Sequence, residues 1–192
     1  MMLIGPPGGA LELRRDGAGR ARVTGRFPYD IPTELAPGRS ETIEARAFAA
    51  RLEAGAEVHF LAGHDFDKPL AARSAGTLRL TDTAEALELE AEIDPGTSWA
   101  RDFLAAHAAG LVRGLSPGFR VTPGGESVER SGAGLLRRIR AAELIELSAV
   151  TVPAYPAAQI DARSWTPTRG LEAVRALIDA AEYVTPFYRW RP

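Results

Sequence analysis

Three polar residues interrupt apolar, strand-like stretches of this sequence, and their types are those that catalyse acyl transfer. Ser116 lies within VRGLSPGFRV, Glu146 lies within LIELSAV, and His64 follows the apolar run HFLAG. A serine, a histidine and a carboxylate at strand ends are the components of a nucleophile, its general base and the group that orients the base. This set predicts a hydrolytic site of the serine type.

Each of these residues also has an ordinary structural explanation. His64 could be a solvated loop residue, Ser116 could mark a β-bulge next to proline and glycine, and Glu146 could pair with an arginine of residues 135–140. Spacing alone therefore indicates a globular domain without assigning its chemistry. Four further residues compete for the same roles: Glu143, His59, His107 and Ser148.

Composition limits the classes of function. The chain has 192 residues, 45% apolar and 25% charged, which suits one globular domain. Its net charge is 23 − 25 = −2, which gives no bulk attraction for nucleic acid. There is no cysteine and only three histidines, which argues against disulfides, thiolate chemistry and a structural zinc site. We expect no metal, no organic cofactor and no membrane or nucleic-acid partner, and we interpret the protein as intracellular.

The expected elements before residue 100 are mostly strands. The segment DGAG between LEL and ARV is typical of a β-hairpin, and residues 27–40, with three prolines, predict an irregular loop. Alternation of Leu, Ala and Ile with Glu predicts an antiparallel strand over residues 86–93. Further expected elements are a short strand over 42–44, a helix over 45–53, and strands over 58–61 and 70–80.

The second half of the chain should hold the core of the site. Residues 94–97 (DPGT) should cap a helix over 98–109 that stops at Gly110, and the two apolar stretches around Ser116 and Glu146 should be core strands. After residue 156 we expect one last strand over 159–163 and an amphipathic helix over 171–183. These patterns predict an α+β domain, mostly an antiparallel β-barrel with helices packed outside.

Five sequence blocks, in this order, resemble the prohead (procapsid maturation) proteases of tailed bacteriophages, including relatives encoded by gene transfer agents. The resemblance spans about residues 20–163. Any one block is weak, whereas five in order are specific. The blocks are AF at 47–48, LAGHD at 61–65 with PLA at 69–71, GTLRL at 76–80, VRGLSPGF at 112–119, and ELIELSAVTVPAYP at 143–156.

The resemblance implies roles for the polar residues. Ser116 would be the nucleophile, His64 the general base and Glu146 the orienting carboxylate, with Glu143 as the fallback because a register slip would change which face the side chain meets. The family is similar to the herpesvirus assembly proteases, which implies a strand-rich barrel surrounded by helices. The residues expected to bind substrate or the oxyanion are Arg113, Gly114 and Gly118.

The sequence departs from the family pattern at two places. After Pro-Leu the family commonly has Gly-Arg, where this chain has Ala71-Ala72-Arg73. The residue after Ser116 is Pro117, which has no backbone N–H, so the donors of an oxyanion hole must come from elsewhere.

The implied function is an endopeptidase that cleaves scaffold or capsid-protein segments, and itself, inside the procapsid in the cytoplasm of a bacterial host. Its partners would be the major capsid protein and its scaffold segment, with self-association open. The alternatives are an inactive relative that serves as an internal scaffold or capsid-binding module, and an unrelated esterase, against which the absence of a G-x-S-x-G elbow counts.

We expect a flexible lead over residues 1–9, a protease domain over 10–163, and a C-terminal helix and tail over 164–192. That last part would dock on capsid or scaffold, shield the site until it is cleaved, or simply pack.

Overall fold

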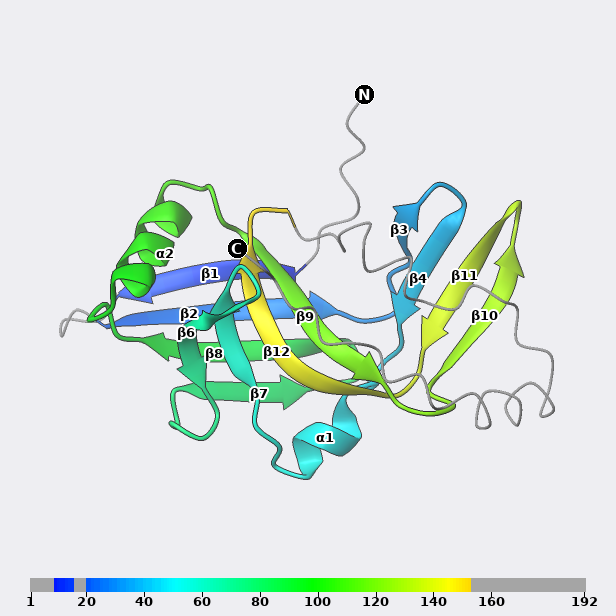
Figure 1. The fold of residues 1–192 in the computed structure, drawn as a ribbon, viewed down its shortest axis with the longest axis horizontal. Helices are drawn as coiled ribbons and strands as arrows, with labels where there is room; N and C mark the ends of the chain where they lie inside the picture. Colours follow the sequence, from blue (N-terminus) through cyan, green and yellow to red (C-terminus); the bar gives the residue numbers. More distant parts are fainter. Residues whose placement is uncertain (1–8, 16–19, 153–192) are drawn as a thin grey trace.

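The computed structural model describes the backbone of residues 9–15 and both backbone and side chains of residues 20–152. Figure 1 shows its strands and helices. The first half contains β1 (Gly9–Arg15), β2 (Ala21–Pro28), β3 (Thr33–Ala36), β4 (Arg39–Ile43), α1 (Ala49–Glu53), β5 (His59–Ala62), β6 (Asp65–Ala72), β7 (Leu78–Asp82) and β8 (Ala86–Ile93). The second half contains α2 (Ser98–Ala108), β9 (Gly114–Val121), β10 (Glu126–Ser131), β11 (Gly134–Ile139) and β12 (Ala142–Val150).

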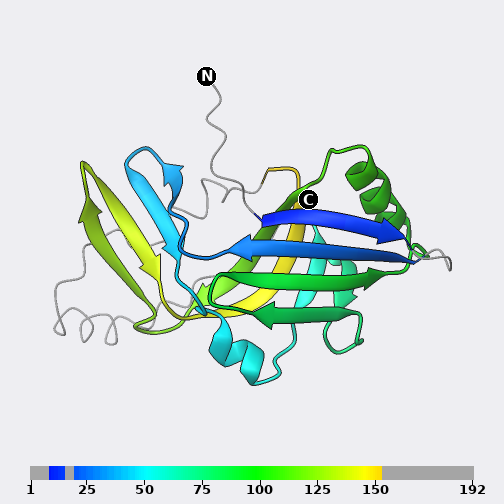
Figure 2. The same ribbon diagram turned by 180° about the vertical axis from the view of Figure 1, so that it is seen from behind.

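The larger of two sheets has eight strands in the order β6-β5-β12-β9-β1-β2-β8-β7. Its pairs are antiparallel except for β12 with β5, which run parallel. The join between β9 and β1 is short, because only Gly9 and Ala10 pair with β9. In Figure 2 the strands β1, β2, β8 and β7 lie in front of β9 and β12, so the sheet bends at this join into two facing halves.

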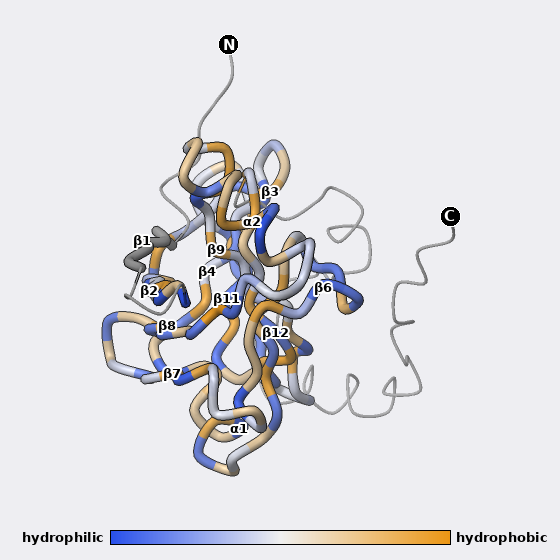
Figure 3. Tube along the Cα trace, turned by 90° about the vertical axis from the view of Figure 1, so that its left-hand side faces the viewer, coloured by the Kyte–Doolittle hydropathy of each residue, from blue (hydrophilic) through white to orange (hydrophobic). Residues whose placement is uncertain are grey.

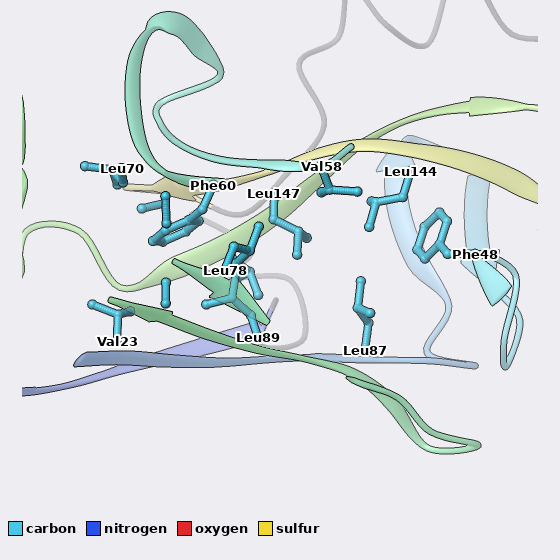
Figure 4. Packing of buried hydrophobic residues seen from close by; sticks show 14 of the residues in the cluster. Val23, Phe48, Val58, Phe60, Leu70, Leu78, Leu87, Leu89, Leu144 and Leu147 are labelled. Carbon is cyan, nitrogen blue, oxygen red and sulfur yellow. The ribbon is translucent and has the colours of Figure 1, made fainter. Parts of the chain in front are cut away.

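The hydrophobic core fills the space between the two halves. Figure 4 shows Phe60 and Leu147 from β5 and β12 facing Val23 and Leu89 from β2 and β8. All four side chains are buried. Because removal of apolar surface from water drives folding, this contact holds the two halves of the sheet together.

Alternation of residue type explains why the sheet has one dry face. Buried and exposed residues alternate along β2, and β8 follows the same pattern with its glutamates outward. Hydrophilic and hydrophobic residues accordingly succeed one another along these strands in Figure 3. Arg22 on β2 pairs with Glu90 and Glu92 on the exposed side of β8, at 3.0 and 3.3 Å. The expected antiparallel strand over residues 86–93 is therefore confirmed.

The smaller sheet, ordered β10-β11-β4-β3, extends from one end of the larger one (Figure 1). A buried arginine holds three of its strands together. Arg137 of β11 donates to Glu41 of β4 at 2.6 Å and to Glu126 of β10. Loss of one partner from a buried ion pair costs about 3–5 kcal/mol, because it leaves an uncompensated charge.

Two helices lie against the larger sheet. The α2 helix begins after Thr97, whose side chain accepts the backbone N–H of Ala100, and it ends just before Gly110, as the sequence predicts. The α1 helix is shorter than expected and starts at Ala49, because Arg46 has a positive φ of 58° that no α-helix allows. No helix of residues 9–15 and 20–152 is long and apolar enough to cross a membrane.

The expectation of one strand over residues 70–80 is wrong. The chain turns after β6 at Gly76, where φ is +70°, and the hydroxyl of Thr77 accepts the backbone N–H of Ala72 across the turn. Residues 27–40, expected as a loop, contain β3 and the end of β2. The hairpin of β10 and β11, which surrounds the glycines of residues 132–134, was not predicted.

The closed barrel that the sequence suggests is not found among the described strands. The outermost strands β6 and β7 follow one another in the chain, yet they do not pair. A physical reason lies in β6, which contains Pro69 and two irregularities in its pairing with β5, both features of edge strands. The described domain is therefore an α+β fold of mostly antiparallel sheets. The strand expected over 159–163, the helix over 171–183 and the tail fall outside the described residues.

The two phenylalanines at positions 60 and 66 provide a test of the core. Phe60 is fully buried between the halves of the sheet, whereas the side chain of Phe66 is 53% exposed. We expect Phe60→Ala to lower the free energy of unfolding by about 3–5 kcal/mol and Phe66→Ala by about 1 kcal/mol or less. Equilibrium denaturation of both variants would measure this, and equal losses would contradict the position of the core.

Candidate active site

The candidate site lies on three neighbouring strands of the larger sheet, β9, β12 and β5. In the pairing of β12 with β9, Ser148 is opposite Ser116 and Glu146 is opposite Gly118. Residues that are directly opposite in a sheet share a face, and so do residues two apart along a strand. Ser116, Gly118, Glu146 and Ser148 therefore lie on one face, and the intervening Leu147 points into the core on the other.

A β-bulge puts Glu146 on that face. The register of β12 against β9 shifts between Leu144 and Glu146, so Ile145 is the extra residue. Both Leu144 and Leu147 are fully buried in the core, which strict alternation would forbid for residues three apart. The bulge resets the alternation, and the glutamate between them turns away from the core.

His64 reaches the site from the tight turn between β5 and β6. Ala62 pairs with Asp65, so the loop consists of Gly63 and His64, with φ values of +67° and +62°. Positive φ at both central residues is the mark of a type I′ turn, which suits the right-handed twist of a hairpin. A non-glycine residue in this conformation costs about 1–2 kcal/mol, so other contacts must hold His64 there.

Two hydrogen bonds tie this turn to β12. The backbone N–H of Gly63 donates to the carbonyl of Ala149 at 2.9 Å. The backbone N–H of His64 donates to the Oγ of Ser148 at 3.0 Å. The turn is thus fixed to the strand that carries Glu146.

The His64 ring contacts the Glu146 carboxylate. Nδ1 of His64 lies 2.7 Å from Oε1 of Glu146, and the other carboxylate oxygen, Oε2, accepts the hydroxyl of Ser148 at 2.5 Å. The glutamate side chain is only 5% exposed, whereas the histidine is 34% exposed. A buried carboxylate is costly unless it is hydrogen-bonded, and here both oxygens have partners.

No hydrogen bond among the described residues joins Ser116 to His64. The two lie on opposite sides of β12, because Ser116 is in β9, on one side of that strand, and the turn that carries His64 follows β5, on the other. Ser116 is nearly buried, at 8% exposure, on the face that holds the His64–Glu146 contact. Since Nδ1 is engaged by the carboxylate, Nε2 is the ring nitrogen left for a hydroxyl.

The fallback carboxylate and the aspartate next to His64 are engaged elsewhere. Glu143 is 41% exposed and lies 4.0 and 3.9 Å from the guanidinium groups of Arg51 and Arg120. Asp65, which adjoins His64, faces Lys68 at 2.9 Å, and the hydrogen bond from that ammonium lowers the pKa of the Asp65 carboxyl. Neither carboxylate contacts the His64 ring.

The competing histidines have other surroundings. His59 of β5 is in register with Glu146, yet its ring packs edge-on against Phe66 at 6.2 Å, and its buried Nδ1 has no hydrogen-bond partner among the described residues. His107 lies on α2 with its ring 6.0 Å from that of Phe103. Of these histidines, His64 is the one whose ring is hydrogen-bonded to the Glu146 carboxylate.

The three residues expected to bind substrate or the oxyanion have different surroundings. The guanidinium of Arg113, before β9, lies over Gly110, where an added Cβ would be 2.7 Å from its Nη2. Gly114 is buried at the start of β9. A Cβ at Gly118 would lie 2.0 Å from Oε1 of Glu146, so only glycine leaves room for the carboxylate.

No group of three or more His, Cys, Asp or Glu side chains in the described part of the chain is placed to hold a metal ion. The chemistry available to these residues is proton transfer. An imidazole that is held through Nδ1 by a buried carboxylate can accept a hydroxyl proton at Nε2 and return it to a leaving group.

Comparison with known proteins identifies the family to which the chain belongs. A family model described as caudovirus prohead serine protease matches residues 10–172. The chain belongs to this family. It is therefore a serine peptidase of phage prohead maturation. No curated protein and no solved structure matches it.

Two features of the candidate site were not predicted from the sequence. Besides the role expected for it toward substrate or oxyanion, which stays a prediction, Gly118 leaves the space that the Glu146 carboxylate occupies. Ser148 was considered only as a competing nucleophile, whereas it bonds both His64 and Glu146. The spacing of Glu146 and Ser148 could have predicted that they lie close together, because residues two apart on a strand share a face.

Gly118→Ala should separate Glu146 from His64. The added methyl would occupy the position of the carboxylate, and we expect peptidase turnover to fall by about 10²- to 10⁴-fold, as when the orienting carboxylate of a serine protease is lost. Gly96→Ala is the control, because Gly96, like Gly118, has no positive φ, is exposed, and its added Cβ would meet only the side chain of Asp94, at 3.2 Å. Equal activity of the two variants would contradict the role of Gly118.

Proposed function

We propose that the protein is an endopeptidase that cleaves scaffold or capsid-protein segments, and itself, inside the procapsid within the bacterial host. Ser116 is the proposed nucleophile, His64 the general base and Glu146 the orienting carboxylate. The observation that carries the proposal is the 2.7 Å contact of His64 with the buried carboxylate of Glu146, on the face of the sheet where Ser116 pairs with Ser148. The major capsid protein and its scaffold segment are the proposed partners. A likeness in fold to the herpesvirus assembly proteases stays part of this proposal.

The mechanism follows from these positions. Nε2 of His64 removes the hydroxyl proton as Ser116 Oγ attacks the substrate carbonyl carbon, and the carbonyl π electrons move to oxygen. When the tetrahedral intermediate collapses, the C–N bond breaks and the imidazolium gives its proton to the leaving amine. Water then attacks the acyl-enzyme by the same route, which releases the acid and restores the serine.

Glu146 has two tasks in this cycle. Its Oε1 accepts a hydrogen bond from the Nδ1–H of His64, which keeps the proton on Nδ1 and leaves Nε2 free to act as a base. It also stabilises the imidazolium that forms when His64 takes the serine proton. The serine and histidine are not hydrogen-bonded in the free protein, and such contacts often tighten only when substrate is bound.

Solvent access favours Ser116 over Ser148 as the nucleophile. Ser148 is 0% exposed, and its hydroxyl is occupied by His64 and Glu146. A substrate carbonyl cannot approach it without breaking both bonds. Ser116 has no hydrogen bond to either His64 or Glu146 and is 8% exposed, on the same face of the sheet as Glu146.

The donors for the oxyanion are proposed from residues near Ser116. Pro117 cannot contribute, because it has no backbone N–H. Arg113, Gly114 and Gly118 remain our candidates. Arg113 would have to leave its position over Gly110 to reach the intermediate.

Ser116→Ala should abolish processing. Co-expression with the major capsid protein or its scaffold, with fragments read by mass spectrometry, would show cleavage by the unaltered protein and none by the variant. Ser131→Ala, at an exposed end of β10, is the matched control and should cleave normally. Processing that survives Ser116→Ala would remove this serine as the nucleophile.

Glu146→Gln and Glu143→Gln separate the two candidate carboxylates. Glu146→Gln should lower turnover by about 10⁴-fold, because an amide can hold the histidine in the wrong tautomer. Glu143→Gln should change turnover less than about twofold, since Glu143 only faces two partly exposed arginines. Steady-state rates on one peptide cut from the mapped cleavage site would measure both, and the reverse order of effects would favour Glu143.

A further inference from the structure

One buried hydroxyl connects the two residues that form the base of the proposed site. The Oγ of Ser148 accepts the backbone N–H of His64 at 3.0 Å and lies 2.5 Å from Oε2 of Glu146. The serine is fully buried and belongs to the same strand as Glu146, two residues further on. Its cross-strand partner on β9 is Ser116.

We propose that Ser148 is a positioning residue that fixes both the His64 turn and the Glu146 carboxylate, and so aligns the base with Ser116. This inference rests on the proposed function of the site. Ser148 touches neither substrate nor the reacting atoms and acts only through its two neighbours.

The direction of both hydrogen bonds is determined by the partners. A backbone N–H can only donate, so Ser148 Oγ is the acceptor from His64. A carboxylate has no proton to give, so the Ser148 hydroxyl must donate to Oε2 of Glu146. One hydroxyl therefore satisfies a donor and an acceptor at once, and neither bond can reverse without leaving a buried group unpaired.

These bonds determine which oxygen faces the histidine. With Oε2 occupied by Ser148, Oε1 is presented to Nδ1 of His64 at 2.7 Å. Gly118 leaves the space that this orientation needs. Because the Glu146 side chain has flexible torsions, removal of the Oε2 bond would free the carboxylate to rotate away from the ring.

The backbone bond has a separate effect on the turn. His64 sits at a φ of +62°, a conformation that is disfavoured for a side chain with a Cβ. The bond from its N–H to Ser148 holds this residue over β12. Loss of the hydroxyl would therefore loosen the base as well as the carboxylate.

The test uses the full chain with Ser148→Ala and Ser148→Cys. Alanine removes the hydroxyl, and cysteine keeps a similar shape with only a weak donor and acceptor. We expect kcat on a peptide from the mapped cleavage site to fall by about 10- to 100-fold in both variants, as for the loss of a hydrogen bond to a charged group, with little change in KM. Ser131→Ala should leave kcat unchanged.

A second readout does not depend on cleavage. The proton on Nδ1 of His64 should give a slowly exchanging ring N–H signal in NMR spectra of protein labelled with ¹⁵N-histidine, assigned by its absence in His64→Gln. Ser148→Ala and Ser148→Cys should lose or broaden this signal while the backbone amide spectrum stays that of the folded protein. A misfolded variant is recognised from the same spectrum, and Ser148→Thr, which keeps the hydroxyl, should then restore both fold and signal.

The outcomes separate the two proposals. An unchanged kcat together with a preserved ring signal in a folded Ser148→Ala variant would overturn the role of Ser148. If the unaltered protein cleaves nothing, or Ser116→Ala still cleaves, the proposed function fails. The ring signal in the Ser148 variants still decides whether this hydroxyl positions His64 and Glu146.

Discussion

A carboxylate that is almost wholly removed from water is the constraint on which the site depends. Glu146 lies within a strand whose neighbours are apolar, and a charge in such a place needs hydrogen bonds in place of its lost hydration. His64 and Ser148 provide them. Because these partners come from a turn and from β12 itself, the sheet must be in register before the carboxylate can be accommodated. The hydrogen bonds that orient His64 are thus the same ones that make the buried Glu146 carboxylate tolerable in the folded protein.

Much of the fold could be predicted from local patterns. The strands β1 and β2, on either side of the sequence DGAG, pair as antiparallel neighbours, α2 has its cap at Thr97, and β8 alternates apolar residues with glutamates. These elements form where expected. The prediction failed where a local signal was weak or absent. The turn at Gly76 lies in an apolar, strand-like stretch, and the parallel pairing of β12 with β5 joins segments far apart in the chain. Barrel closure depends on whether β6 and β7 pair, which no local pattern encodes.

The candidate site also has features that the sequence predicts and features that it does not. The types and order of His64, Ser116 and Glu146 could be read from the sequence through their resemblance to a protease family. Which glutamate meets the histidine could not, because the bulge at Ile145 decides the face on which Glu146 lies. The role of Gly118 was also hidden, since it follows from a side chain that comes from 28 positions later in the chain.

The place of β12 in the larger sheet has a consequence for the timing of activity. This strand lies between β5 and β9, yet it comes after all seven other strands of that sheet in the chain. Synthesis proceeds from the N-terminus, and a central position cannot be filled until its strand has left the ribosome. Until β12 is synthesised, β5 and β9 lack the strand that lies between them, and His64 lacks its hydrogen-bond partners Glu146 and Ser148. The residues of the proposed site would therefore come together only once the last strand of the sheet is in place.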